Sequence, residues 1–244
     1  MGNKVQFGLN KLHVAFLDEV AGTYEAPIPV PGVVNLSLTP EGESSPFYAD
    51  DSLYFSNDTN AGYTGDVESA LIPDAVLAKM LGWGTDTAGG LVELADGIQK
   101  PFAMLFEVNG DVAKKRYAFY HVLAARPTEA HKTKTTNAEP DTQSLALTIS
   151  PRLIAGALLV KRALERVATP PARVNTTAYA LNALVAGGGN VFKATTAGTS
   201  GAAAPTWPAS GTVTDGTVVW TFVGPTNATV FDAWYTAVPL PTFA

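Results

Sequence analysis

The residues best suited to proton transfer in this chain are three histidines, and none has a partner at a catalytic spacing. His13, His121 and His131 occur singly, without the His-Glu-x-x-His pattern of a zinc site. No G-x-S-x-G nucleophile elbow is present. His13 and His121 fall within alternating strand patterns, which favours structural roles for both. The chain has no cysteine, which excludes thiol nucleophiles, disulfides and thiolate metal sites.

Acidic and glycine-rich segments give no stronger chemical signal. Asp50 and Asp51, with Glu41 and Glu43, could form a calcium site or a carboxylate pair, but the EF-hand spacing is absent. A solvated acidic loop is the favoured interpretation. The three glycines at 187–189 lack the Lys-Ser/Thr of a phosphate loop and indicate a turn. We therefore expect no catalytic residue, no metal and no cofactor, and we do not expect an enzyme.

Charge is distributed unevenly along the 244 residues, whose net charge is −6. Residues 1–70 contain two basic and ten acidic residues. This is not the basic footprint of a nucleic-acid-binding protein, nor of a surface attracted to anionic membranes. No apolar run reaches the roughly 18 residues of a membrane-spanning helix. We also expect no secretory signal, because no apolar segment follows Lys4.

Most of residues 1–165 is predicted to form strands. Apolar side chains alternate with small or polar ones over residues 12–16, 34–38 and 144–150. Phe102, Met104, Phe106 and Val108 share one strand face, and Tyr117, Phe119, His121 and Leu123 share another. The turn residues 109–111 (Asn-Gly-Asp) predict a hairpin between two of these strands. One helix is predicted at about 73–82, between Pro73 and Gly82. Residues 152–166 suit either a helix or a strand, and a final strand near 157–164 is favoured.

Two long loops are predicted. Residues 128–141 are polar and include His131, Lys132 and Lys134. Residues 40–62 contain five acidic residues, no basic residue and four aromatic residues. A loop of this length is usually functional or disordered, and its aromatic content argues against disorder.

A change in composition marks a second unit at 170–244, which carries only four charged residues. Pro170-Pro171 is the expected linker, because tandem proline favours an extended spacer. Residues 213–218 predict another hairpin. Trp207, Trp220 and Trp234 are candidates for either the surface or the core of this unit. Exposed, they could bind sugars, but a core role for at least one is favoured, because so small a unit has few other large side chains to bury.

Several segments occur in a fixed order along the first unit: VQFGLNKLHVAFL, PVPGVVNLSLTPEGESSPFYADDSLYF, GYTGDVESALIP, PFAMLFEVNGD and RYAFYHVLAARP. In this order they resemble the major tail protein, or tail tube protein, of long-tailed bacteriophages (siphophages). The resemblance covers about residues 4–165. The later segment FKATTAGTSGAAAPTWPASGTVTDGTVVWTFVG resembles a small β module appended to phage tail and fibre proteins.

The resemblance implies a mainly β fold: a tail-tube-type β-sandwich or barrel at 1–169 with one flanking helix, plus a small β-rich C-terminal extension at 170–244, expected on the tube exterior. It implies a structural virion protein that forms stacked hexameric rings, the tail tube through which DNA is ejected. The implied partners are further copies, the tape measure protein, tail terminator and distal tail proteins, and DNA passing without specific binding. The implied location is the phage tail, and the host cytoplasm during assembly.

These expectations assign roles to particular residues. We expect the 40–62 loop to contact the next ring through Phe47, Tyr48, Asp50, Asp51, Tyr54 and Phe55. The acidic balance of residues 1–70 predicts a bore lined by acids, with Asp58, Asp66 and Glu68 as candidates, or else acids that lie outside and keep the particle soluble. An alternative function is a non-polymerising phage adhesion protein that binds host surface glycans through the C-terminal module. In a further alternative, residues 225–244 pack on a neighbouring subunit.

Overall fold

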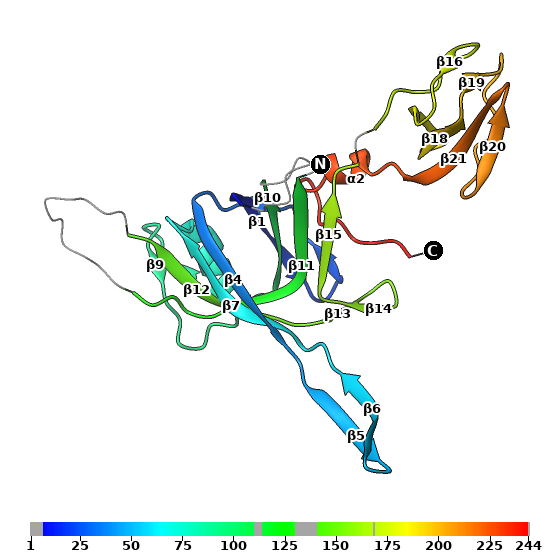
Figure 1. Ribbon diagram of the computed structural model, residues 1–244. Coiled ribbons are helices and arrows are strands. Elements are labelled where there is room, and N and C mark those ends of the chain that lie inside the picture. The colour runs from blue at the N-terminus through cyan, green and yellow to red at the C-terminus, as the bar shows by residue number, and fades with distance from the viewer. Residues whose placement is uncertain (1–6, 110–113, 130–140, 168, 244) are drawn as a thin grey trace, which may run out of the picture. The chain divides into compact units, whose positions relative to one another are not determined.

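The computed structural model describes residues 7–109, 114–129, 141–167 and 169–243. The protein is mainly β, as predicted, and divides into two compact units (Figure 1). The first unit comprises Met1–Leu164 and Ala233–Ala244, and the second comprises Glu165–Asp232. The second unit is therefore inserted into the chain of the first, whereas the sequence predicted an appended unit beginning at residue 170.

The first unit contains β-strands and one helix. Its elements are β1 (Leu9–Asp18), β2 (Thr23–Tyr24), β3 (Ile28–Pro29), β4 (Val33–Glu41), β5 (Ser44–Ala49), β6 (Ser52–Asp58), β7 (Gly62–Ser69), α1 (Asp74–Leu81), β8 (Gly84–Thr85), β9 (Leu91–Val92), β10 (Phe102–Val108), β11 (Lys115–Ala124), β12 (Gln143–Ile149), β13 (Arg152–Ile154), β14 (Ala157–Leu159) and β15 (Lys161–Glu165).

One antiparallel sheet of nine strands organises this unit. Its order is β2-β1-β10-β11-β12-β7-β4, and β15 and β3 pair with β11 and β1. Strand β11 pairs with β10 from Lys115 to Val122, and its last three residues pair with β12. Strand β4 also approaches β1, so the sheet curls toward closure. The period-two patterns of the sequence correctly predicted these strands, because each buries alternate side chains inside the curled sheet.

Helix α1 covers one side of the enclosed core, at the position predicted. Val76, Leu77 and Met80 pack with the inner side chains of the sheet, such as Phe102 and Leu145. The helix ends at Gly82, which has a φ of 68°, a left-handed conformation that glycine adopts at little cost. At 152–166, where the sequence left helix and strand open, the chain forms strands β13, β14 and β15.

The C-terminal segment (residues 233–243) belongs to the first unit. Trp234 is fully buried there with Leu105, Ala118 and Tyr120, on the face of β10 and β11 that points away from the main core. The Trp234 indole Nε1 donates to the Tyr117 carbonyl at 3.3 Å. The chain therefore packs this segment on its own sheet, which corrects the assignment of Trp234 to the C-terminal module.

The predicted 40–62 loop is instead the extension of β4 and β7 by a two-stranded hairpin, β5–β6. Phe47 pairs with Phe55, and Ala49 pairs with Ser52. The turn residues Asp50 and Asp51 have φ values of 50° and 55°. Two positive φ values are typical of the type I′ turn that closes hairpins, which usually takes glycine or asparagine. The sequence did not reveal this hairpin because its turn contains two aspartates and no glycine.

The second unit is a small β-sheet domain. Its elements are β16 (Ala178–Tyr179), β17 (Leu184–Gly187), β18 (Asn190–Thr196), β19 (Gly198–Thr199), β20 (Thr212–Asp215), β21 (Val218–Pro225) and α2 (Ala228–Asp232). The sheet order is β17-β18-β21-β20, and Val185, Phe192 and Trp220 form its core. The predicted hairpin at 213–218 is present as β20–β21. Pro171 is part of this unit rather than a free linker, because its carbonyl accepts from the Ala186 amide at 3.0 Å.

Candidate functional site

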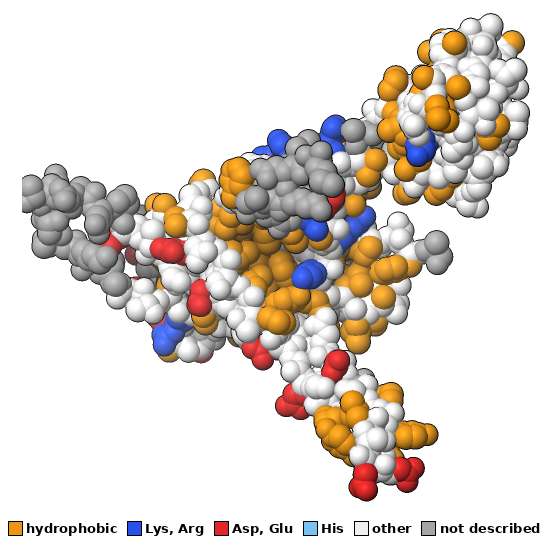
Figure 2. Space-filling model, in the orientation of Figure 1, with side chains coloured by type: hydrophobic (Ala, Val, Ile, Leu, Met, Phe, Trp, Pro, Cys, Tyr) orange, Lys and Arg blue, Asp and Glu red, His pale blue; other side chains and the backbone are white. Residues whose placement is uncertain are grey.

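The β5–β6 hairpin presents apolar side chains that no described part of the chain covers. Phe47, Tyr48, Leu53, Tyr54 and Phe55 are between 57% and 73% exposed. Figure 1 shows the ribbon extending beyond the main sheet, and Figure 2 shows its hydrophobic side chains gathered along it. A two-stranded ribbon without a covering layer is at best marginally stable in water, so this hairpin is suited to burial against a partner.

The aromatic side chains are arranged by an irregularity in the hairpin. The pairing shifts register between Phe47 and Tyr48, so that Tyr54 is the extra residue of β6. The rings of Phe47 and Tyr54 meet edge to face, with centroids 6.4 Å apart. Phe55 lies directly across from Phe47. Three of the six predicted contact residues thus form one aromatic surface on the ribbon.

The hairpin is also acidic. Asp50 and Asp51 form its tip, and Glu43 and Asp58 lie near its base. No basic residue occurs between Glu41 and Asp66. Figure 2 shows the carboxylates at the tip beyond the apolar side chains. A partner surface for this hairpin therefore has to combine apolar area with positive charge.

The outer face of strands β4, β7 and β12 has a different character: its side chains are small or acidic. Pairing across the three strands gives the rows Asn35–Glu68–Ser144, Ser37–Asp66–Ala146 and Thr39–Thr64–Thr148. The side chains that alternate with these, such as Val67, Leu145 and Leu147, point into the core. Asp66 and Glu68 thus share one smooth face, whereas the third acidic candidate, Asp58, lies in the hairpin.

The main sheet has a free edge beside this face. Among the described strands, β4 is hydrogen-bonded only to β7, and Val34 on β4 is 56% exposed. Strand β4 approaches β1 without being hydrogen-bonded to it, and an unpaired strand edge is a template for pairing with another chain. Strands β4 and β7 thus connect all three features: they extend into the hairpin, they carry part of the acidic face, and β4 provides the free edge.

The histidines have structural contacts. His121 Nδ1 lies 2.7 Å from Ser150 Oγ, which links β11 to the end of β12. Burial lowers the pKa of His121, which keeps the ring neutral at pH 7. The His13 ring stacks on Tyr235 of the C-terminal segment, with ring centroids 4.4 Å apart. His131 lies outside the described residues, as do Lys132 and Lys134.

Within the described ranges, no three histidine or acidic side chains group in a way that could hold a metal ion. The acidic cluster predicted around Asp50 and Asp51 forms the turn and the flanks of the hairpin instead. No helix among the described residues is long and apolar enough to cross a membrane.

The tryptophans of the second unit serve its core. Trp220 is fully buried, and Trp207 packs on Phe192 with ring centroids 4.4 Å apart. Gly187 lies directly under the Trp207 ring, where a Cβ would collide with it, and Gly188 lies against the Trp207 Cβ. The glycine run predicted as a simple turn thus also makes room for this ring. Trp220 is therefore no candidate for glycan binding, whereas Trp207 is half-buried at the surface of the unit.

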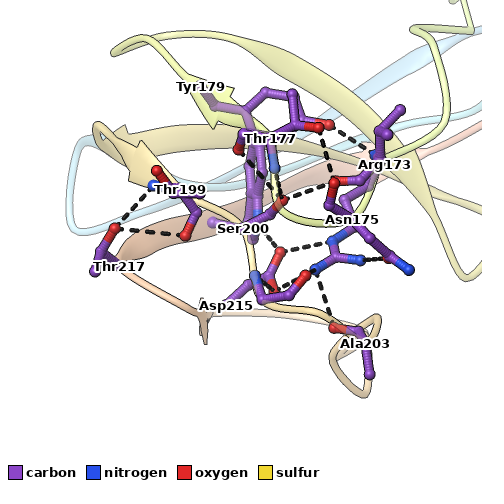
Figure 3. Close-up of polar contacts among 12 residues, drawn as sticks. Arg173, Asn175, Thr177, Tyr179, Thr199, Ser200, Ala203, Asp215 and Thr217 are labelled. Atoms are coloured by element: carbon purple, nitrogen blue, oxygen red, sulfur yellow. Dashed lines mark hydrogen bonds and ion pairs between the residues drawn. The ribbon is translucent and has the colours of Figure 1, made fainter.

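A buried ion pair holds the second unit together, and sequence reasoning missed it. Arg173 Nε and Nη2 donate to both carboxylate oxygens of Asp215 at 2.8 and 2.7 Å, and both side chains are 2% exposed. Asp215 also accepts from Trp220 Nε1 and the Gly201 amide, and Arg173 also donates to the Ala203 carbonyl (Figure 3). These groups satisfy one another, so the network is structural rather than catalytic.

The electrostatics of Asp215 follow from this network. Burial raises the pKa of the Asp215 carboxyl, but the hydrogen bonds from Arg173, Trp220 and Gly201 outweigh burial and hold the pKa below its usual value. Glu107 in the first unit behaves similarly. Burial raises its pKa, and the hydrogen bonds from Arg116 and Lys11 more than reverse that effect. No local pattern in the sequence identifies either pair, because the partners are far apart or on adjacent strands.

Comparison with known proteins does not assign the chain to a family. The sequence matches no protein-family model, and no curated protein matches it significantly.

Proposed function

We propose that this protein is the tail tube subunit of a long-tailed bacteriophage. Copies form hexameric rings, and the rings stack into a tube through which DNA is ejected into the host. The observation that carries the proposal is the β5–β6 hairpin, which exposes aromatic side chains that no described part of the chain covers. The ordered segments of the first unit that resemble major tail proteins support the choice of assembly.

The main sheet supplies suitable parts for such a ring. The free edge of β4 is available for strand pairing with a neighbouring subunit. If each copy contributes four strands, a ring has about 24; at roughly 4.8 Å spacing and 40° tilt its backbone diameter is roughly 48 Å. Such a bore is wide enough for duplex DNA once side chains are added.

The outer face of β4, β7 and β12 is the best candidate for the lining of the bore. Its small side chains leave the passage open, and Asp66 and Glu68 repel the phosphates of DNA. A cationic lining would bind the genome and slow its exit. The proposed partners are further copies of this chain, a tape measure protein, the terminator and distal tail proteins, and DNA that passes without specific binding. The second unit is proposed to lie outside the tube, because a bore that passes DNA has no room for a domain.

Electron microscopy of the purified protein over a range of concentrations tests the proposal. We expect six-fold rings and tubes. Replacing residues 44–58 with a two-residue Asn-Gly turn should leave folded monomers that do not form tubes, because the turn still closes the β4–β7 ribbon. A matched control replaces two exposed apolar residues elsewhere, Val20→Ser and Ile98→Ser, and should form normal tubes. If the unaltered chain stays monomeric at every concentration, the proposal that it forms a tube is refuted. Normal tubes from the variant without the hairpin would refute the proposed role of the hairpin in assembly.

A further inference from the structure

The main sheet of the first unit divides into two branches at strand β11. Strands β12 and β15 lie one after the other beside β11: the Ser150 amide donates to the His121 carbonyl at 3.1 Å, and the Tyr120 amide donates to the Val160 carbonyl at 3.2 Å. Strands β12, β7 and β4 form one branch, which continues into the β5–β6 hairpin (Figure 1). Strand β15 is the other branch, and among the described strands it pairs only with β11. Side-chain contacts between the branches can therefore set the direction in which the hairpin leaves the sheet.

One side-chain contact joins the two branches at the base of the hairpin. Lys161 Nζ, on β15, donates to the Tyr63 hydroxyl, on β7, at 2.7 Å, and it lies 4.8 Å from the centre of the Tyr63 ring. The Tyr63 ring also meets the Phe119 ring of β11 edge to face, with centroids 5.6 Å apart. Phe119 is buried in the main core. Tyr63 thus contacts both a core aromatic side chain and a lysine of the other branch, and we call Tyr63, Phe119 and Lys161 the base clamp.

The backbone beside the base clamp is closely packed. Gly62 immediately precedes Tyr63, and a Cβ on Gly62 would lie 1.8 Å from the Ile149 carbonyl oxygen. Only glycine permits so close an approach of two strands. Ile149 is also the residue of β12 that pairs with Tyr63. The start of β7 is therefore fixed on β12 by its backbone and on β11 and β15 by the Tyr63 side chain.

The ribbon between the sheet and the hairpin transmits this fixed direction. The Ala61 amide donates to the Glu41 carbonyl at 2.9 Å, and the Thr59 amide donates to the Glu43 carbonyl at 2.9 Å. These hydrogen bonds connect the last pair of the β4–β7 ladder to the first pair of the β5–β6 ladder. The two chains thus stay paired from the base clamp to the hairpin, so a change in direction at Tyr63 moves the whole hairpin.

We infer that the base clamp holds the β5–β6 hairpin in one direction in the free subunit, and that Tyr63 and Lys161 are positioning residues for assembly. The inference rests on the proposed function, in which the hairpin contacts another molecule. A segment that is already held in its bound direction loses less conformational entropy when it docks. The clamp therefore lowers the concentration at which tubes form, although none of its side chains belongs to the exposed aromatic surface of the hairpin.

Four substitutions separate the hydrogen bond of the clamp from its packing. Tyr63→Phe removes the hydroxyl and leaves the ring on Phe119. Lys161→Met removes the ammonium and leaves an unbranched side chain. Lys161→Arg keeps a charged donor at the same place and should behave as the unaltered chain. Lys193→Met, which changes an exposed lysine of the second unit, is the matched control.

Distances between two spin labels in the free subunit measure the direction of the hairpin. The chain has no cysteine of its own, so Ser52→Cys at the hairpin turn and Gln99→Cys before β10 each take one label. Below the concentration that gives tubes, the otherwise unaltered chain should give one narrow distribution of distances by pulsed electron resonance. Tyr63→Phe and Lys161→Met should each widen it. The two together should widen it no more than either alone, because both remove the same hydrogen bond.

Assembly and stability give two further readouts, measured without labels. Tyr63→Phe and Lys161→Met should each raise the concentration needed for tubes by about fivefold, the effect expected from losing one hydrogen bond to a charged group at a partly exposed site. Lys161→Arg and Lys193→Met should leave this concentration unchanged. The urea midpoint of the first unit should stay the same in all four variants. Side chains that served stability alone would lower the midpoint and leave the label distances narrow.

The outcomes separate this inference from the function on which it rests, because the label distances need no tubes. A broad distribution in the unaltered chain, or a narrow one in both Tyr63→Phe and Lys161→Met, overturns the inference whether or not tubes form. Variants with broad distributions that assemble at the normal concentration overturn the link between the clamp and assembly. If the unaltered chain forms no tubes while its distances respond to the clamp variants, the proposed function fails and the clamp's hold on the hairpin stands.

Discussion

Trp234→Ala is expected to destabilise the first unit by about 4 kcal/mol, although this residue follows the second unit in the chain. The side chain is fully buried against β10 and β11, and its indole donates to the Tyr117 carbonyl at 3.3 Å. Truncating a buried tryptophan costs roughly 3–5 kcal/mol, and losing a long hydrogen bond adds less than about 1 kcal/mol. Total stabilities are about 5–15 kcal/mol, so the loss is a large fraction of the whole.

The C-terminal segment makes further contacts that deletion of residues 233–244 would remove. The Pro239 carbonyl accepts from the Tyr120 hydroxyl at 3.0 Å, and it also accepts from Arg162 Nη1. The Tyr235 ring lies against the Arg116 guanidinium. Deletion should therefore cost at least as much as Trp234→Ala and leave the first unit largely unfolded at 37 °C.

Hydrogen exchange against urea measures the two units separately, through peptides from β10 and from β18. Trp234→Ala should weaken protection in β10 alone, and the matched control Trp207→Ala should weaken it in β18 alone. Excising residues 166–232 and joining the ends with a short Gly-Ser linker should leave β10 protected to within about 1 kcal/mol, since the ends of the insertion already meet. A loss under about 1 kcal/mol in Trp234→Ala, or an excised chain that unfolds, would refute this account.

Three further predictions concern charge and the hairpin turn. The pKa of Asp215 is lower in the folded protein than in the unfolded chain. Its contribution to the free energy of unfolding is therefore complete above the unfolded pKa of about 4, and it is lost as pH falls through the folded pKa. Acid unfolding of the second unit should therefore begin below about pH 4. Asp215→Asn should remove this pH dependence of stability. It should also lower the free energy of unfolding at pH 7, measured with urea, by about 3 kcal/mol, because it leaves Arg173 buried without its partner. A variant as stable as the unaltered chain would contradict this. Asp66→Lys with Glu68→Lys should leave tube formation intact but make the tubes retain DNA in low salt, which gel retardation at increasing ionic strength would detect; tubes that pass DNA unchanged would place this face elsewhere. Asp51→Gly should stabilise the hairpin by about 0.5–1 kcal/mol, because glycine suits its φ of 55°; unchanged hydrogen-exchange protection in β5 and β6 would argue against a strained turn.

The strands of the curled sheet could be predicted because their signal is local. Alternation along β12 specifies that Leu145 and Leu147 point inward, whatever the rest of the chain does. The β5–β6 hairpin was harder to predict, because Asp50-Asp51 does not resemble a favoured hairpin turn. The long-range pair Arg173–Asp215 was not predictable from one sequence: its partners are 42 residues apart, and only the fold brings them together.

The insertion of the second unit is explained by which side chains of β10 are buried. Strand β10 reads as a nearly continuous apolar run, Phe102 to Phe106, which is typical of a strand covered on both faces. Alternation along β10 predicts only the face of Phe102, Met104 and Phe106, and it gives no partner for Leu105 on the opposite face. Trp234 supplies that partner, so the first unit needs both ends of its chain. An inserted domain is compatible with this only if the chain enters and leaves it at neighbouring positions. Asn227 joins these positions, because its Oδ1 accepts from the Val167 amide and its Nδ2 donates to the Glu165 carbonyl. Arg166 also pairs with Asp232 at 3.6 Å. The insertion point therefore joins neighbouring chain ends, and the first unit can close its sheet whatever the inserted domain does.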